Sequence, residues 1–137
     1  MKREIKFRGL SIKTYTWFYG YYYFDGNNHI IVDDTLNHIK VEKESVTQYT
    51  GLKDEKGIDI YEGDIIIFHA SYTSEERCGY KTGVIKWDSN YIRFNIYVSG
   101  FEEPFDCYNE TDEWHYKREV IGNIYENPEL IWKCQTN

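Results

Sequence analysis

Apolar and polar side chains alternate with a period of two along most of this chain, the pattern of strands that bury one face. The clearest case is residues 83–88 and 91–98, two alternating segments joined by Ser89-Asn90. They predict an antiparallel hairpin, and such one-sided strands are typical of sandwiches and small barrels rather than of parallel sheets. The side chains expected on the two matching faces are Ile85 and Trp87 in the first strand and Ile92, Phe94, Ile96 and Val98 in the second.

A second pair of strands is predicted around a turn signal. Residues 14–24 contain the densest group of aromatic side chains, interrupted at Gly20, and residues 29–32 read HIIV. Between them stands Asp25-Gly26, a dipeptide that favours tight hairpins. The apolar run at residues 64–68 predicts a further strand.

Two other segments have shorter patterns. Residues 33–45 fit two structures, because their two leading aspartates would cap a short helix whereas Ile39 and Val41 alternate as in a strand. Near the C-terminus, the tripeptide Asn-Pro-Glu at 127–129 predicts the start of a one-turn helix. Asn is a good N-cap, and Pro fits the first helical position.

The composition indicates one folded domain of mainly β structure. The chain has 137 residues, enough for a single core. Aromatic residues make up 18% of it, and aromatic side chains favour strands.

The charge disfavours duplex nucleic acid as a partner. The net charge is −7, and affinity for a duplex comes mainly from Lys and Arg. The charge is unevenly spread, since residues 1–13 are basic and residues 101–116 are acidic. This distribution has three interpretations. The two segments attract each other within the fold, they make a head-to-tail contact between subunits, or they form two unrelated solvated faces.

The cysteines and the apolar runs indicate a protein of a reducing cytoplasm, without a metal centre or a membrane segment. Cys78, Cys107 and Cys134 are odd in number and widely spaced, which predicts neither a disulfide framework nor a zinc site. The longest apolar run is too short to span a bilayer. The four histidines at 29, 38, 69 and 115 lack metal-site spacings.

The stretch QYTGLKDEKGIDIYEGDIIIF at residues 48–68 combines glycines and acidic residues but matches no cofactor motif. It lacks the Lys-Ser/Thr pair of a phosphate-binding loop, and Lys56 stands where a calcium loop needs an oxygen ligand. Residues 54–57 instead predict a polar hairpin turn, with Gly57 at positive φ.

The carboxylates of Asp59, Glu62 and Asp64 in this stretch have two interpretations. They form an acid/base group if burial or neighbouring charges shift their pKa values. Alternatively they are structural: Glu62-Gly63-Asp64 is a tight turn in which Asp64 binds turn amides and Gly63 meets a backbone constraint. No catalytic residue, cofactor-binding residue or metal ligand is therefore assigned.

The aromatic segment offers a candidate interaction surface. At strand spacing, Trp17, Tyr19, Tyr21 and Tyr23 share one face, and Phe18, Tyr22 and Phe24 share the other. Such rings seal a core, form a protein interface, or stack on the bases of a single strand, for which Lys2, Arg3, Lys6 and Arg8 would supply nearby positive charge.

Three sequence blocks together resemble the YopX family of proteins encoded by bacteriophages and prophages. They are REIKFRG at residues 3–9, the stretch at residues 48–68, and EVIGNIYENPEL at residues 119–130. The first block departs from the family, which commonly has Ala-Trp where this chain has Gly9-Leu10. The residues that carry the family motifs, as structural positions, are Gly51, Gly57, Tyr61, Gly63, Asp64, Gly122, Asn123 and Pro128.

The resemblance implies a mainly β fold in two lobes. Residues 61–137 would form a small SH3-like barrel, and residues 1–60 an antiparallel β region packed on it. It also implies a phage or prophage origin and a homo-oligomer, and it brings no catalytic residues.

Three functional hypotheses follow. The first is a non-enzymatic accessory protein that binds itself and a host or phage protein. The second is a module that binds single-stranded nucleic acid through the aromatic segment. The third is a hydrolase that uses Asp59, Glu62 and Asp64.

Overall fold

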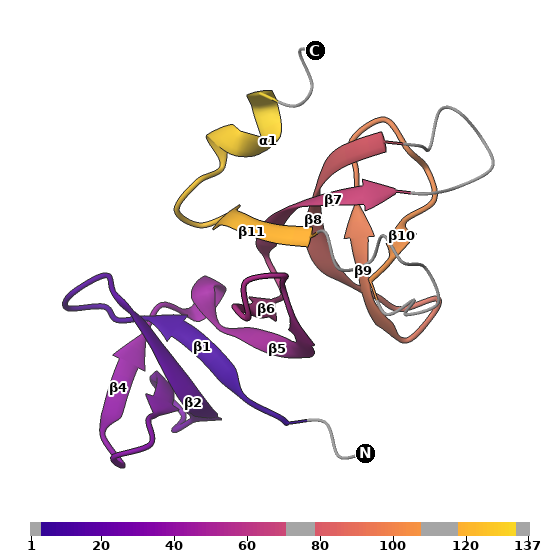
Figure 1. The fold of residues 1–137 in the computed structure, drawn as a ribbon. Coiled ribbons are helices and arrows are strands. Elements are labelled where there is room, and N and C mark those ends of the chain that lie inside the picture. The colour runs from indigo at the N-terminus through magenta and orange to yellow at the C-terminus, as the bar shows by residue number, and fades with distance from the viewer. Residues whose placement is uncertain (1–3, 71–78, 108–117, 134–137) are drawn as a thin grey trace. The chain divides into compact units, whose positions relative to one another are not determined.

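The chain folds into two compact units of antiparallel β structure. The computed structural model describes residues 4–70, 79–107 and 118–133 (Figure 1). The N-terminal unit is Met1–Gly51 and the C-terminal unit is Leu52–Asn137. Strands dominate both units, and the one α-helix in the described part of the chain is short. The predicted mainly β, antiparallel fold class is confirmed.

The N-terminal unit is a sheet in which neighbouring strands are antiparallel. Its strand order is β4-β3-β2-β1-β5. The predicted strand at residues 29–32 is confirmed with the same bounds, and in residues 33–45 the strand alternative holds. The elements are β1 (Phe7–Leu10), β2 (Trp17–Phe24), β3 (His29–Val32), β4 (His38–Val41), the 3-10 turn Lys43–Ser45, and β5 (Thr47–Lys53).

Strand β2 changes partners at Gly20. Its first half pairs with β1, from Leu10↔Trp17 to Phe7↔Gly20, and its second half pairs with β3, starting at Tyr21↔Val32. At the change, Gly20 has φ 155° and approaches the end of β3 closely. A Cβ atom on Gly20 would lie 1.9 Å from the carbonyl oxygen of Val32. Only glycine fits here, because any side chain would collide with backbone.

The sheet of the N-terminal unit curls until β1 and β4 meet at one end. Ser11 and Val41 form an isolated antiparallel bridge, and the Glu42 N–H donates to the Leu10 carbonyl at 2.9 Å. The curl places the Val41 side chain against Gly9, where a Cβ atom would lie 2.8 Å from Val41. The buried apolar residues of this unit are Ile30, Ile31, Val41 and Tyr49.

Aspartate side chains hold the turns of this unit. Asp25 Oδ1 accepts hydrogen bonds from the N–H groups of Asn27 and Asn28 at 2.8 and 2.6 Å, which closes the predicted hairpin turn. In the loop between β3 and β4, Asp33 Oδ1 accepts from the Asn37 N–H at 2.8 Å. Short polar side chains favour such turns because they bind backbone groups a few residues away.

The C-terminal unit contains a five-stranded antiparallel sheet of order β10-β9-β8-β7-β11 (Figure 1). Strands β10 and β11 lie at its two edges, and no pairing in the described residues joins them. The register of β11 on β7 shifts between Val120 and Gly122. The elements are β6 (Asp59–Tyr61), β7 (Asp64–Ala70), β8 (Gly79–Asp88), β9 (Arg93–Tyr97), β10 (Phe105–Asp106), β11 (Arg118–Asn123) and α1 (Glu129–Lys133).

The predicted hairpin of residues 83–98 is present, with a longer loop than expected. Its last pair is Asp88↔Arg93, so the loop comprises residues 89–92 rather than Ser89-Asn90 alone. The Asp88 carboxylate accepts the Asn90 N–H at 2.9 Å, and this hydrogen bond stabilises the first turn of the loop. Ile92 was expected to face the core, but it has φ 54° and is 76% exposed.

The core of the C-terminal unit lies on the face that the sequence pattern predicts. The pairs Ile85↔Ile96 and Trp87↔Phe94 place alternating side chains on one side of the hairpin, although Trp87, expected on the buried face, is 46% exposed. The buried cluster consists of Ile60, Ile66, Phe68, Ile85, Phe94, Ile96, Phe105 and Cys107.

The buried Asp54 carboxylate joins the predicted turn at residues 54–57 to strand β11. Its Oδ1 accepts the N–H groups of Lys56 and Ile58, both at 2.9 Å, and its Oδ2 accepts the Val120 N–H at 3.1 Å. The Glu55 N–H donates to the Arg118 carbonyl at 3.0 Å. Gly57 has φ 81°, as the sequence predicted.

Replacing Gly20 with alanine is expected to lower the free energy of unfolding of the N-terminal unit by about 3 kcal/mol, because a backbone clash must be relieved. Gly26→Ala is the control. Gly26 also has positive φ, but its Cβ would meet no atom within 4 Å, so about 1 kcal/mol is expected. Urea unfolding measures both losses, and equal losses would contradict the clash.

Replacing Asp54 with alanine is expected to lower the free energy of unfolding by about 3 kcal/mol or more, because three amide donors lose a largely buried acceptor. Asp25→Ala removes a similar but exposed turn carboxylate and should lower the free energy of unfolding clearly less. Hydrogen exchange at the Val120 amide should accelerate in the Asp54 variant only. Unchanged exchange there would refute the role of Asp54.

Candidate functional site

The aromatic face of β2 is exposed. We define this aromatic face as Trp17, Tyr19, Tyr21 and Tyr23. Tyr19 is 48% exposed, Tyr21 72% and Tyr23 39%, and Trp17 is partly buried. On the opposite face, Phe18 and Tyr22 are partly buried, whereas Phe24 is 55% exposed. Of the alternatives left open by the sequence, a core role does not fit Tyr19, Tyr21 and Tyr23, because their side chains are exposed.

A groove of about 540 Å³ runs beside the aromatic face. It lies where β2 changes partners, since Gly20 and Val32 both line it. Its aromatic lining residues are Trp17, Phe18, Tyr19 and Tyr21. The close approach at Gly20 therefore helps to shape a concave site beside the strand.

Carboxylates outnumber cations around this groove. Its charged lining residues are Glu4, Lys6, Asp33 and Asp34. Lys6 Nζ lies 3.7 Å from Glu4 Oε1 and 4.8 Å from the centre of the Tyr49 ring. The hydrogen bond from the Asn37 backbone lowers the pKa of Asp33, so its carboxylate stays ionised near neutral pH.

Arg8 lies under the aromatic face rather than at its surface. Its guanidinium carbon is 4.3 Å from the centre of the Trp17 ring, and its Nε donates to Thr47 Oγ1 at 3.1 Å. The residue is only 5% exposed. Arg8 was expected to supply charge for a nucleic acid, but it holds Trp17 in place instead. Lys2 and Arg3, named for the same role, lie outside the described residues.

Comparison with known proteins decides the family. The family model described as YopX protein matches residues 6–132, nearly the whole chain. The chain belongs to the YopX family. The predicted resemblance is confirmed.

A solved structure supports the fold of this YopX family member. The chain is similar to the crystal structure of protein EF1440 from Enterococcus faecalis, at 26% sequence identity and a TM-score of 0.55. The match covers 95% of this chain and 99% of that one. No curated protein matches the chain.

The YopX motif residues occupy turns and close contacts. Gly51, Gly57 and Gly63 all have positive φ, of 91°, 81° and 88°. The Tyr61 N–H donates to Asp64 Oδ2 at 2.8 Å, so the predicted structural role of Asp64 in the turn is confirmed.

The C-terminal motif residues support the turn between β11 and α1. Asn123 Oδ1 accepts the N–H groups of Tyr125 and Glu126 at 3.0 and 2.9 Å. A Cβ atom on Gly122 would lie 2.6 Å from Asn127 Oδ1, and Pro128 directly precedes α1. The Asn127 side chain accepts the Asn123 N–H at 3.3 Å, so it turns back toward β11.

Two of the three carboxylates of the hydrolase hypothesis, those of Asp59 and Asp64, have different structural partners. Asp59 pairs with Lys53 at 2.5 Å, and Asp64 is 2% exposed and bound to the Tyr61 amide. Burial raises the pKa of Glu62 above its ordinary value. None of the three lines the groove or the second cavity described below.

The histidines and cysteines of the described residues do not gather into a metal-binding group. No cluster of three or more His, Cys, Asp or Glu with suitable geometry occurs in residues 4–70, 79–107 and 118–133. His29 contacts Tyr22 Oη through Nδ1 at 2.5 Å, and His38 contacts Tyr23 Oη at 3.0 Å. Cys78, Cys134 and His115 lie outside those ranges. Over the same ranges, no helix is long and apolar enough to cross a membrane.

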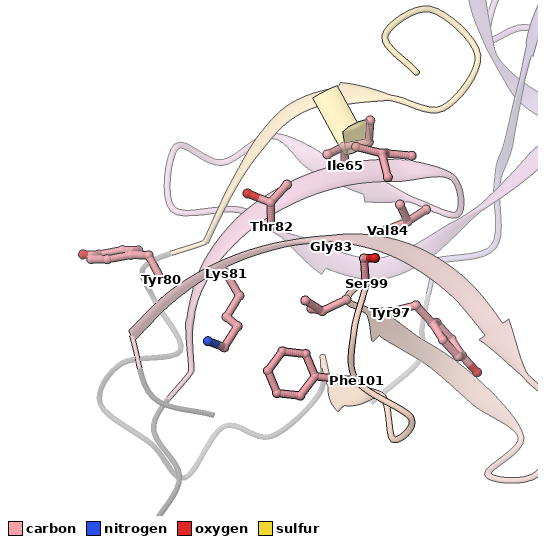
Figure 2. Close-up of a pocket in the computed structure, with 11 residues that line it drawn as sticks. Ile65, Tyr80, Lys81, Thr82, Gly83, Val84, Tyr97, Ser99 and Phe101 are labelled. Atoms are coloured by element: carbon pink, nitrogen blue, oxygen red, sulfur yellow. The ribbon is translucent and has the colours of Figure 1, made fainter. Parts of the chain in front are cut away.

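The C-terminal unit has a second cavity, of about 420 Å³, beside β8 and β9 (Figure 2). Its walls combine apolar side chains such as Val84 and Phe101 with the hydroxyl groups of Thr82 and Ser99. Lys81 is its one charged lining residue, and its Nζ lies 5.2 Å from the centre of the Phe101 ring. Figure 2 shows the Lys81 side chain directed toward Phe101.

Sequence reasoning identified the rings of the aromatic face but missed the charges beside them. Asp33 and Asp34 were interpreted only as a possible helix cap, although they directly follow the strand that pairs with β2. That position was the signal available in the sequence. Neither Glu4 nor the Lys81 cavity has a local pattern that marks it.

Cys107 is expected to be unreactive in the folded protein. Burial raises the pKa of its thiol to about 12, and the side chain is 1% exposed. The thiolate is the reactive form, and only about one molecule in ten thousand would carry it at pH 8. Iodoacetamide should therefore label Cys107 in urea but not in buffer, as read by peptide mass spectrometry. Equal labelling in both would contradict its burial.

Proposed function

We propose that this YopX family member is a non-enzymatic protein-binding and self-associating module, and that the aromatic face of β2 is its binding surface. One observation carries the proposal. Three tyrosines, 39% to 72% exposed, stand in a row on one strand beside a groove of about 540 Å³.

The physical argument rests on what an exposed row of tyrosines does. Each ring presents a large apolar surface together with a hydroxyl group, and Tyr loses little conformational entropy when it is covered. Tyr and Trp are accordingly enriched at protein interfaces and among their hot spots. The sheet presents these rings on a rigid strand, which lowers the cost of binding further.

The charges favour a protein over a single-stranded nucleic acid. A strand that stacks its bases on these rings would bring its phosphates toward Glu4, Asp33 and Asp34. Binding of single strands relies on a positively charged groove, and here Lys6 is the one cation in the lining. Asp59 and Asp64 have structural partners, and none of Asp59, Glu62 and Asp64 lines either cavity, which favours a non-enzymatic role over a hydrolase.

Membership of the YopX family supports the biological setting that we propose. The proposed protein is a phage or prophage accessory factor. It acts in the cytoplasm of a bacterial host, on a host or phage protein. We also propose that the C-terminal lobe, from Tyr61 onward, is an SH3-like barrel. The short antiparallel strands and the register shift in β11 support this, because such bulges help a sheet to curve.

Self-association gives the direct test of this function. Light scattering after size exclusion should detect oligomers of the wild-type chain. The double variant Tyr19→Ser, Tyr21→Ser should associate at least about tenfold more weakly, since interface tyrosines carry much of the binding energy. The double variant Tyr80→Ser, Tyr91→Ser is the control, because it removes two equally exposed tyrosines from the C-terminal unit.

Two results would contradict this proposal. One is a wild-type chain that stays monomeric at about 200 μM, a concentration at which even weak interfaces associate. The other is equal association of the wild-type chain and the Tyr19, Tyr21 variant.

A further inference from the structure

The groove beside the aromatic face has a chemical character that selects its ligand. Three carboxylates, those of Glu4, Asp33 and Asp34, and a single ammonium group, that of Lys6, surround the rings. Glu4 and Asp34 are exposed. An anionic rim around aromatic walls is complementary to a cation that carries an apolar stem.

Asp33 is held in position and kept charged by its own loop. Its Oδ1 accepts hydrogen bonds from the N–H groups of Thr35 and Asn37, at 3.1 and 2.8 Å, and its Oδ2 accepts from Asn37 Nδ2 at 3.1 Å. A fixed carboxylate loses no side-chain entropy when a cation approaches. Asp33 therefore attracts a cation at a lower entropic cost than a mobile carboxylate side chain would.

The same sheet already holds cations on aromatic rings. The Arg8 guanidinium lies 4.3 Å from the centre of the Trp17 ring, and Lys6 Nζ lies 4.8 Å from that of Tyr49. Such contacts are attractive because the ring face is electron-rich. Tyr21, 72% exposed and in the groove wall, offers the same kind of ring to a cation from outside.

We propose that this groove binds a lysine or arginine side chain of a partner protein. The inference rests on the proposed protein-binding function and specifies its ligand. The stem of the cation lies along the rings of Tyr19 and Tyr21, and its charged head meets the carboxylates. A phosphate group would be repelled by the same carboxylates.

Fluorescence anisotropy with a labelled synthetic peptide tests this ligand. The peptide repeats Gly-Ser-Arg, and its control carries citrulline, the neutral isostere, at each arginine. At about 50 mM salt, where screening is modest, the arginine peptide should bind at least about tenfold more tightly. A labelled oligothymidylate should bind more weakly than the arginine peptide.

Matched variants locate the binding. Neutralising the rim with Glu4→Gln and Asp34→Asn should lower the affinity for the arginine peptide at least about fivefold. Neutralising two exposed acids of the C-terminal unit, with Glu102→Gln and Glu103→Gln, should leave its affinity unchanged. Tyr21→Ala should also weaken binding, whereas Tyr21→Phe should preserve it, because the ring and not the hydroxyl group contacts the cation.

Three outcomes would overturn the inference. They are equal affinity for the arginine and citrulline peptides, equal loss from the two pairs of neutralised acids, and tighter binding of the oligothymidylate. Because self-association is measured separately, the two proposals fail separately. If the peptide does not bind but the Tyr19, Tyr21 variant still associates weakly, only the ligand assignment is wrong. If neither effect occurs, both proposals are wrong.

Discussion

The change of partners within β2 is the constraint on which the N-terminal unit depends. A strand that leaves β1 and takes up β3 in the middle of its length must pass the end of β3 at close range. Gly20 allows this, because the space for a Cβ atom is already occupied by the Val32 carbonyl oxygen. The groove lies at this crossing, so the element that shapes the fold also creates its concave surface. A substitution at Gly20 would therefore change the fold and the groove at the same time.

In the C-terminal unit the corresponding role belongs to a buried carboxylate. Asp54 satisfies N–H groups from its own turn and from β11, which is distant in sequence. An unsatisfied amide within a protein is costly, so this one side chain fixes where the tip of the turn lies. The Lys56–Glu119 ion pair, at 2.6 Å, joins the same two segments at the surface, where exposure limits its strength.

The sequence predicted what depends on near neighbours. Strand β3, the shared face of Ile85 and Ile96, and the turn at Gly63-Asp64 follow from periodicity and turn chemistry, and all are present. Contacts between distant segments were not predictable in this way. The packing of Val41 on Gly9 and the acidic rim of the groove both arise from them. The exposed position of Ile92 was missed because its backbone follows the Asp88 turn rather than the alternation.

The aspartates that hold turns give this acidic chain a particular sensitivity to acid. They accept backbone N–H groups in both units, and they are Asp25, Asp33, Asp54, Asp64 and Asp88. The Asn28 and Asn37 backbones lower the pKa of Asp25 and Asp33, respectively, below the ordinary 3.8. The stability from these two bonds is thus complete above that pH and is lost as the pH falls through the lowered values. Part of the negative charge therefore serves the architecture of the turns, and protonation of these aspartates removes charge and turn hydrogen bonds together.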